Sequence, residues 1–329
     1  MERRRLGTFG PSVSVLGLGC MNLSGNYGPT SEADAMALLA RAVELGIDHL
    51  DTADIYGIGQ NEELIGQFLR TSRARVKIAT KVGIRFVRIT GERYIDNTPA
   101  YIRQAVENSL SRLGRDHIDL LYVHRREVGR PIEELMEAMA RLKQEGKVGA
   151  IGLSEVSAET IRQAHACYPV NAVQNEYSIW TRVPERGVLD ATRQLGIALV
   201  AFSPVARGLL TGSPPDPASM APRDFRRSNP RFLPENYVRN REVADKLATV
   251  AAELGRTPAG LALAWLIARS RHIVAIPGTR SIAHLEDNVR GVAVPLGLEE
   301  TKRVEAILPD GFPWGARYSA VQALGVEEV

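Results

Sequence analysis

Four ionisable side chains stand at or just beyond the ends of apolar runs, where a buried strand would give way to a turn. Asp51 and Tyr56 occur in GIDHLDTADIYG, residues 46–57, while Lys81 closes IATK and His124 closes LLYVH. Turn chemistry alone would account for a lone aspartate at such a place. Tyrosine, lysine and histidine add groups that donate or hold protons, so the four together indicate acid-base chemistry if the fold brings them into contact.

Apolar segments of strand character alternate with amphipathic segments of helical period along the chain. The first helix is expected to begin at the N-cap Ser31 and to end at Gly46, with a strand directly after it. About eight such strand-helix units follow one another, the number that closes a (β/α)₈ TIM barrel. An open doubly wound sheet is the rival fold, and the lack of a G-x-G-x-x-G turn after the first strand disfavours it. We therefore expect one α/β barrel domain over residues 1–329.

Parallel strands of a barrel all end at one rim, so the four side chains are expected to converge there, at an active site. Taken singly, each has a structural explanation: Lys81 as a surface residue with a buried stem, His124 as a core residue and Tyr56 as a rim aromatic. A lysine buried at the rim is costly unless a carboxylate pairs with it, and Asp51 is placed to do so. The ammonium would also lower the pKa of the Tyr56 hydroxyl from about 10, which favours proton donation to an oxygen that gains negative charge.

One segment interrupts the alternation of strands and helices. Residues 212–240 are rich in Pro, Arg and Asn and form a stretch far longer than the usual ~2–6-residue βα loop. The segment follows the seventh expected strand, on the face where barrel active sites form. We expect a lid or a cofactor clasp there.

The composition excludes several classes of protein. The chain is 44% hydrophobic and 24% charged, as is usual for a globular domain, and its net charge is only +3 with 41 basic residues scattered among 38 acidic ones. No basic patch calls for nucleic acid. Cys20 and Cys167 show no pairing pattern and exclude a cysteine-based zinc site. No segment reaches the ~18 apolar residues of a membrane span, and the first residues do not resemble a signal peptide. We expect a soluble cytoplasmic protein with a small-molecule partner; the oligomeric state stays open.

Taken in order, DTADIYG, ATK and LLYVH resemble the aldo-keto reductases, (β/α)₈ barrels that reduce carbonyl compounds with NADPH, and the likeness extends from LGLGCM to LEDN. It implies that Tyr56 donates the proton, that Lys81 lowers the pKa of Tyr56, that Asp51 holds Lys81, and that His124 orients the substrate carbonyl. GLGCMNLSGNYGP, NEYSIW and PGTRSIAHLEDN are most similar to the bacterial and fungal branch with broad aldehyde ranges.

The same resemblance implies a site for NADPH/NADP⁺ in the second half of the chain. Ser154 and Gln174 would hold the nicotinamide carboxamide, and Phe202 would stack on the ring where the family commonly has tyrosine. Other implied contacts, to the pyrophosphate and the adenosine phosphate among other groups, are Met21, Ser203, Val205, Arg207, Gly208, Gly278, Thr279, Arg280, His284, Asp287 and Asn288. His284 replaces a usual arginine, which weakens the expected grip on the 2′-phosphate. Tyr27, Ile55 and Trp180 are expected in the substrate pocket.

Two other functions compete with carbonyl reduction. Potassium-channel β subunits share this fold and cofactor but act chiefly as regulatory partners, so a cofactor site alone does not require turnover. A metal-dependent barrel hydrolase would need clustered histidines and carboxylates at strand ends, and among six histidines His124 alone is placed there. We therefore expect no metal site and favour the reductase.

Overall fold

Eight parallel strands form a closed barrel in the computed structural model, which describes residues 1–87, 89–90, 92–222 and 224–327. In chain order the barrel strands are β3 (Leu18–Gly19), β4 (His49–Asp51), β5 (Lys77–Val82), β8 (Ile118–Val123), β9 (Val148–Ser154), β10 (Ala172–Glu176), β11 (Ala198–Phe202) and β12 (Ile273–Ala275). A parallel bridge joins Leu16 to Ala275, and the amide of Gly17 donates to the carbonyl of Ala275 at 2.8 Å. These contacts close the sheet between its two end strands, so the predicted TIM barrel is confirmed and the open sheet is excluded.

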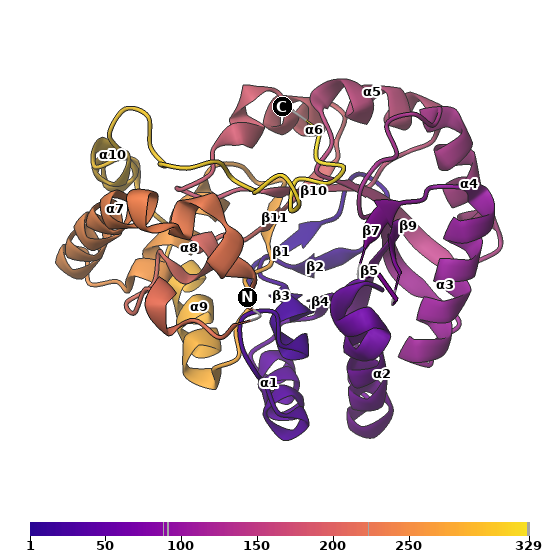
Figure 1. Cartoon of the computed structure of the whole chain (residues 1–329), viewed down its shortest axis with the longest axis horizontal. Coiled ribbons are helices and arrows are strands. Elements are labelled where there is room, and N and C mark those ends of the chain that lie inside the picture. Colours follow the sequence, from indigo (N-terminus) through magenta and orange to yellow (C-terminus); the bar gives the residue numbers. More distant parts are fainter. Residues whose placement is uncertain (88, 91, 223, 328–329) are drawn as a thin grey trace.

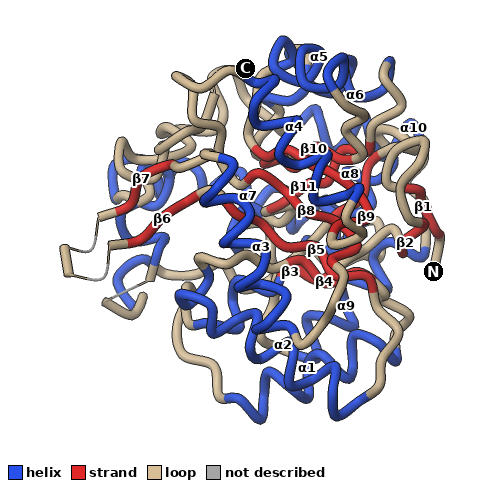
Figure 2. The backbone as a smooth tube through the Cα atoms, turned by 90° about the vertical axis from the view of Figure 1, so that its right-hand side faces the viewer, coloured by secondary structure: helices blue, strands red, loops and turns tan. Residues whose placement is uncertain are grey.

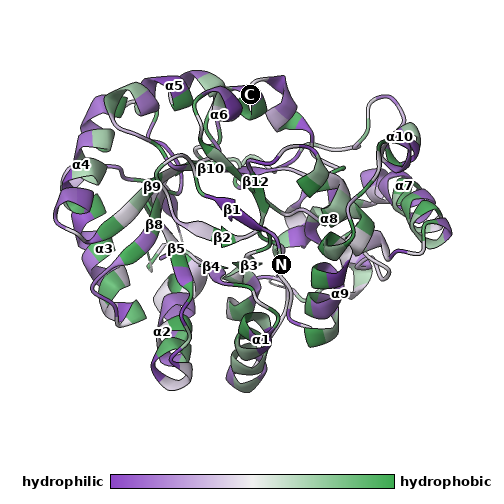
Figure 3. Ribbon diagram, turned by 180° about the vertical axis from the view of Figure 1, so that it is seen from behind, coloured by the Kyte–Doolittle hydropathy of each residue, from purple (hydrophilic) through white to green (hydrophobic). Residues whose placement is uncertain are grey.

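Helices surround the barrel (Figure 1). They are α1 (Glu32–Glu44), α2 (Gln60–Ser72), α3 (Pro99–Leu113), α4 (Ile132–Gln144), α5 (Ala158–Cys167), α6 (Val188–Gln194), α7 (Pro234–Glu253), α8 (Pro258–Ala268), α9 (Ile282–Ala293) and α10 (Leu298–Ala306). Helix α1 begins where its cap predicts, because Ser31 Oγ accepts the amide of Asp34 at 3.1 Å. Polar residues lie mainly on the outer faces of the ring and apolar residues toward the strands (Figure 3). None of the helices within the described residues combines the length and apolar character needed to cross a lipid bilayer.

Alanines, larger aliphatic side chains such as Leu120 and Val200, and one tyrosine fill the interior of the barrel. Ala79, Ala150 and Ala198 are buried there together with Tyr122. Gly152 makes room for that ring, since a Cβ at this position would lie 2.3 Å from Cδ1 of Tyr122. The interior is therefore a packed core, and ligands must bind at an end of the barrel.

A short hairpin, β1 (Arg3–Arg5) paired with β2 (Ser12–Ser14), covers the end of the barrel where the strands begin (Figure 3). Its Leu6 and Val13 are buried against the interior residues, and the amide of Thr8 donates to the carbonyl of Gly196, just before β11, at 2.9 Å. The opposite rim, where the strands end, is the end left for a site. The apolar run SVSVLGLGC, residues 12–20, has the pattern of a single first strand, but the structure divides it between β2 and β3.

Two segments at this rim were not predicted as the structure has them: one loop is shorter than expected, and one hairpin was missed. The expected loop 212–240 ends earlier, because α7 starts at Pro234, a residue whose fixed φ suits the first helical position. An antiparallel hairpin, β6 (Ile84–Phe86) with β7 (Arg93–Ile95), projects from the rim after β5 (Figure 2).

The C-terminal segment, residues 307–327, runs from α10 across the rim toward α5 and α6 (Figure 1). Glu327 fastens its end, because one carboxylate oxygen accepts the amide of Ser157 at 2.8 Å and the hydroxyl of Thr160 at 2.7 Å. The segment therefore covers part of the site.

Candidate active site

The four ionisable side chains predicted to meet do lie together at the rim where the strands end. Asp51 is the last residue of β4, Lys81 is next to last in β5, and His124 directly follows β8. Tyr56 opens a short 3₁₀ helix, η2 (Tyr56–Gly59), after β4. Parallel pairing of β4 with β5 and of β5 with β8 sets this arrangement, because it brings the ends of three neighbouring strands to one edge.

Lys81 lies at the centre of the group. Its ammonium forms an ion pair with Asp51, and the two residues are only 1% and 2% exposed. It also donates to the carbonyl of Thr52 at 2.8 Å and to Tyr56 Oη at 3.4 Å. The second carboxylate oxygen of Asp51 accepts Nε2 of Gln174 at 2.7 Å. Both buried charges, on Lys81 and on Asp51, are thus paired and hydrogen-bonded, and without such partners their burial would be costly.

Tyr56 and His124 face one another beside this pair. Their ring centroids are 5.9 Å apart at an interplanar angle of 83°. Nδ1 of His124 is buried and has no hydrogen-bond partner among the described residues. An unpartnered polar atom at this place is suited to a ligand.

Burial is the main influence on how these groups titrate. It raises the pKa of Tyr56 above its ordinary value, and the Lys81 ammonium opposes this rise without reversing it. Lys81 thus lowers the pKa of this hydroxyl, as expected, but burial raises it by more, so the net pKa lies above the ordinary value. Burial also holds the pKa of His124 well below its ordinary value, with help from Arg125, Lys81 and Arg93.

The resulting charge states suit proton donation. Burial alone would lower the pKa of Lys81, but Asp51 and Tyr56 raise it above its ordinary value, so the ammonium stays charged. Tyr56 keeps its proton and His124 is neutral near pH 7. A hydroxyl that retains its proton beside a cation donates readily to an oxygen on which negative charge develops.

One cavity of about 960 Å³ connects this group to the second half of the barrel. Its lining includes Asp51, Tyr56 and His124, while Lys81 lies beneath them. All of the residues predicted to contact a cofactor line the same cavity, namely Met21, Ser154, Gln174, Phe202, Ser203, Val205, Arg207, Gly208, Gly278, Thr279, Arg280, His284, Asp287 and Asn288. So do two of the three expected substrate residues, Tyr27 and Ile55.

The part of the cavity beyond β11 and β12 suits an elongated anion. The chain after β11 turns through left-handed residues, with φ of 51° at Ser203, 51° at Ala206 and 99° at Gly208. The amides of Ala206 and Gly208 donate to carbonyls within the turn at 2.9 and 3.0 Å, and the turn as a whole lines the cavity. Helix α9 presents its N-terminus to the cavity, with Arg280 just before it and His284 in its first turn. The residues present therefore fit a phosphate-bearing cofactor.

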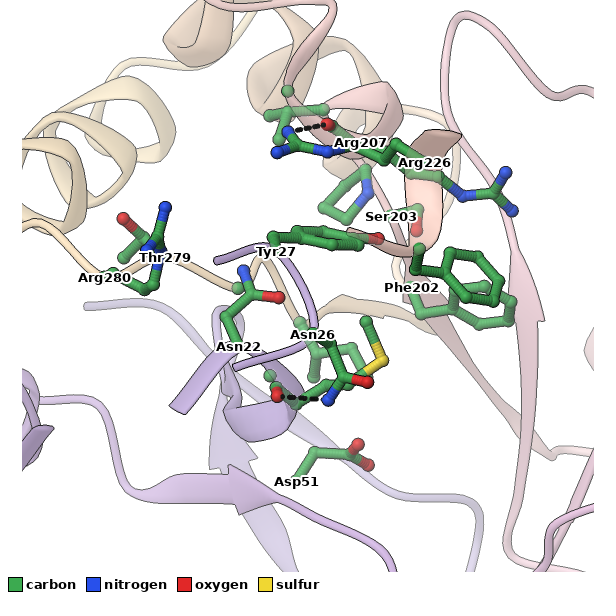
Figure 4. Close-up of a pocket in the computed structure, with 18 of the residues that line it drawn as sticks. Asn22, Asn26, Tyr27, Asp51, Phe202, Ser203, Arg207, Arg226, Thr279 and Arg280 are labelled. Carbon is green, nitrogen blue, oxygen red and sulfur yellow. Dashed lines mark hydrogen bonds between the residues drawn. The ribbon is translucent and has the colours of Figure 1, made fainter. Parts of the chain in front are cut away.

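A segment after β11 crosses over this part of the cavity. The amide of Phe225 donates to the carbonyl of Asn26, in the loop after β3, at 3.1 Å. The guanidinium of Arg226 lies 4.6 Å from the ring centroid of Tyr27. Figure 4 shows Tyr27 at the middle of the site, with Arg280 on one side and Phe202 on the other. The segment is thus joined to the opposite wall of the cavity at Phe225 and Arg226.

Two of the predicted residues have partners within the protein that the sequence did not indicate. The guanidinium of Arg207 pairs with Glu176 at 2.8 Å, so its charge is already engaged within the protein. Trp180 does not line the cavity; it is buried and packs edge-on against Phe312 with ring centroids 5.1 Å apart. Packing of the C-terminal segment over β10 explains why this aromatic belongs to the core.

A buried charge cluster beneath the C-terminal segment was not predicted. It consists of Glu155, Glu176, Arg207, Arg231 and Arg317. Burial alone would raise the pKa of Glu176, but the three arginines hold it below its ordinary value. Glu155 directly follows β9, and Glu176 is the last residue of β10. Because Arg317 pairs with both, the cluster ties the C-terminal segment to the rim.

The C-terminal segment itself supplies cavity residues that sequence reasoning missed. Tyr318, Val321, Gln322 and Leu324 line the cavity. The concentration of aromatic residues in FPWGARY, residues 312–318, was the available signal, since aromatics are uncommon in a solvated terminus.

Similarity to known proteins agrees with this geometry. Residues 15–309 match the model of the aldo/keto reductase family. The chain is 42% identical over 312 residues to "Aldo-keto reductase yakc [NADP(+)]" of Schizosaccharomyces pombe, covering 93% of this chain and 92% of that one.

Two solved structures resemble the whole barrel. The glycerol dehydrogenase AKR11B4 from Gluconobacter oxydans has a TM-score of 0.85 at 26% identity and covers 93% of this chain and 94% of its own. The holo form of the aldo-keto reductase AKR11C1 from Bacillus halodurans has a TM-score of 0.79 at 32% identity and covers 98% of this chain and 99% of its own. The protein therefore belongs to the aldo-keto reductase family.

Proposed function

We propose that this protein reduces an aldehyde or ketone to the alcohol with NADPH, and that the reaction is reversible. The observation that carries the proposal is the buried Lys81–Asp51 pair beneath Tyr56, at one end of a cavity whose other end suits a phosphate-bearing ligand. The NADP(+) in the name of the fission yeast relative and the holo form of the Bacillus halodurans structure support the choice of cofactor.

Each residue has a distinct part in this proposal. When bound, the cofactor supplies a hydride to the carbonyl carbon. Tyr56 holds the proton and delivers it from Oη to the carbonyl oxygen, while Lys81 stabilises the negative charge left on the tyrosine. His124, neutral at pH 7, orients the carbonyl oxygen. Ser154 and Gln174 would hold the carboxamide of the cofactor, and Phe202 would stack on its ring.

No metal takes part in the proposed reaction. Across residues 1–87, 89–90, 92–222 and 224–327, no three His, Cys, Asp or Glu side chains gather as a set of metal ligands.

Cys20 is buried and Cys167 exposed, and neither is in a disulfide, which is in keeping with the cytoplasmic location that we propose.

The experiment that tests the function follows the absorbance of the reduced nicotinamide with purified protein, NADPH and a panel of aldehydes, ketones and dicarbonyls. Loss of absorbance that depends on protein and on the carbonyl compound, with the alcohol recovered, is expected. NADPH binding without turnover on every compound would instead favour a regulatory role like that of the potassium-channel β subunits.

The pH dependence of reduction should be flat around neutrality. With NADPH saturating, kcat/KM is expected to stay constant from pH about 6.5 to about 9. The reason is that the pKa of Tyr56 lies above the ordinary pKa of tyrosine, and the pKa of His124 lies well below the ordinary pKa of histidine. The rate should fall at still higher pH, as the donor is lost. A single titration centred near pH 7 would contradict these charge states.

Cofactor preference should depend on Arg280. A 2′-phosphate needs a fixed cation, and Arg280 lies at the N-terminus of α9 without a carboxylate partner among the described residues. Arg280→Ala is expected to weaken NADPH binding roughly tenfold and to leave NADH binding nearly unchanged, the latter serving as the internal control.

His284 should add a smaller share than an arginine would, because its ring cannot form the planar two-pronged contact with a phosphate that a guanidinium forms. His284→Arg is therefore expected to tighten NADPH binding. Dissociation constants for both cofactors check both variants, and equal affinity of the wild-type protein for the two cofactors would refute this part of the proposal.

A further inference from the structure

Two arginines from separate segments line the cavity together with Tyr56 and His124. Arg93 belongs to β7, and Arg125 directly follows His124. Neither belongs to the segments that carry the proposed cofactor contacts. Within the described part of the chain neither guanidinium forms an ion pair. By contrast, Arg85 of the same hairpin and Arg126, next to Arg125, each form one.

The register of the hairpin explains why Arg93 faces the cavity. Arg93 pairs with Phe86 and Ile95 pairs with Ile84, and residues paired across an antiparallel hairpin project to the same side. Ile84 and Arg93 both line the cavity. Arg85 projects to the other side, where it forms an ion pair with Asp96 at 3.0 Å. The hairpin thus neutralises one arginine and presents the other to the cavity.

Arg125 is held close to the reacting groups. Its guanidinium donates to the carbonyl of His124 at 2.6 Å and to Ser154 Oγ at 3.3 Å, and the side chain is half-buried. The next residue, Arg126, points elsewhere and pairs with Glu327 at 3.0 Å. Here too, the arginine that lines the cavity is the one that pairs with no carboxylate among the described residues.

Acidic side chains do not offset these two charges. The acidic residues in the described lining are Asp51, which Lys81 neutralises, and Asp287, which accepts Thr257 Oγ1 at 2.7 Å and contacts Arg290 at 3.4 Å. Excess positive charge in a cleft with low-dielectric walls attracts anions. The effect reaches the site, since Arg125 and Arg93 both add to the low pKa that burial gives His124.

We infer that the carbonyl substrate is an anion, an aldehyde or ketone bearing a carboxylate that Arg93 and Arg125 bind while its carbonyl oxygen faces Tyr56. The inference rests on the proposed function and names its substrate class. The carboxylate takes no part in the bond changes; it positions the molecule. Arg125 supplies the half-buried contact, and Arg93 supplies the exposed contact from the hairpin. Arginine is suited to this because its planar fork matches a carboxylate.

The test compares ortho-, meta- and para-carboxybenzaldehyde with their methyl esters, which remove the charge and add one methyl group. In the wild-type protein at least one acid should have a higher kcat/KM than its ester, and the advantage should shrink as salt screens the exposed Arg93. Arg93→Gln and Arg125→Gln should each lower kcat/KM for that acid about tenfold or more and change the value for its ester little, because each removes a hydrogen bond to a charged group. Arg85→Gln is the matched control and should leave the acid-to-ester ratio unchanged.

Esters reduced as well as the acids at every position, or a ratio insensitive to both substitutions, would overturn the inference while leaving carbonyl reduction intact. A binding experiment needs no turnover, so it tests the anionic subsite even if the proposed reductase function fails. Titration of benzoate and of benzamide into the protein, with and without NADPH, should show tighter binding of benzoate that Arg125→Gln abolishes. Equal binding of the two would reject an anionic subsite whether or not turnover occurs.

Discussion

Tyr56→Phe should reduce the turnover of any aldehyde or ketone by ~10²–10⁴-fold, the range typical for loss of a general acid. The substitution removes the hydroxyl that lies 3.4 Å from the Lys81 ammonium and keeps the ring that packs against His124. NADPH binding and stability should therefore remain close to those of the wild-type protein. Single-turnover rates together with the NADPH dissociation constant measure the two effects separately.

A Tyr56→Phe protein with turnover within a few-fold of wild type would remove this hydroxyl from the mechanism. His124→Gln provides a comparison at the same site. It should lower kcat/KM by weakening the orientation of the carbonyl, while the hydroxyl of Tyr56 stays in place to donate the proton.

Lys81→Met should abolish reduction and also destabilise the fold. Met keeps most of the length of the buried side chain, but Asp51 then loses the cation to which it is paired, and breaking a buried pair costs about 3–5 kcal/mol. Urea unfolding should show this loss of free energy. Tyr56 would also lose the charge that opposes the rise in its pKa.

Stability and catalysis can be separated by a second substitution. Lys81→Met combined with Asp51→Asn leaves no uncompensated charge, so much of the lost unfolding free energy should return while reduction stays absent. Turnover near the wild-type rate in either variant would show that the ammonium is not needed for proton donation.

The convergence of Asp51, Tyr56, Lys81 and His124 could be predicted because it depends only on the alternation of strands and helices. Once parallel strands close into a barrel, residues that end neighbouring strands share a rim whatever their separation in the sequence. The cavity residues beyond β11 and β12 were predicted in another way, from the resemblance of their segments to the aldo-keto reductases. The start of α7 at Pro234 was missed because proline and asparagine indicate a loop as readily as the first turn of a helix.

Features that depend on contacts between distant segments could not be predicted. Arg207 looks available for an anion in the sequence, but its partner Glu176 lies 31 residues away and is brought to it by the end of β10. Trp180 belongs to the core because Phe312, in the C-terminal segment, packs on it. The net pKa of Tyr56 likewise depends on how much water the folded rim excludes, a quantity that spacing does not contain.

The most direct measurement of the central claim follows deuterium from NADPH labelled at both C4 positions of its nicotinamide. Benzaldehyde and para-carboxybenzaldehyde are incubated with the labelled cofactor and the wild-type protein, and with Tyr56→Phe as the control, and the alcohols are analysed by mass spectrometry. The account predicts one deuterium on the former carbonyl carbon with the wild-type protein and almost no alcohol with the variant. Alcohol without deuterium, or equal yields from the two proteins, would contradict it.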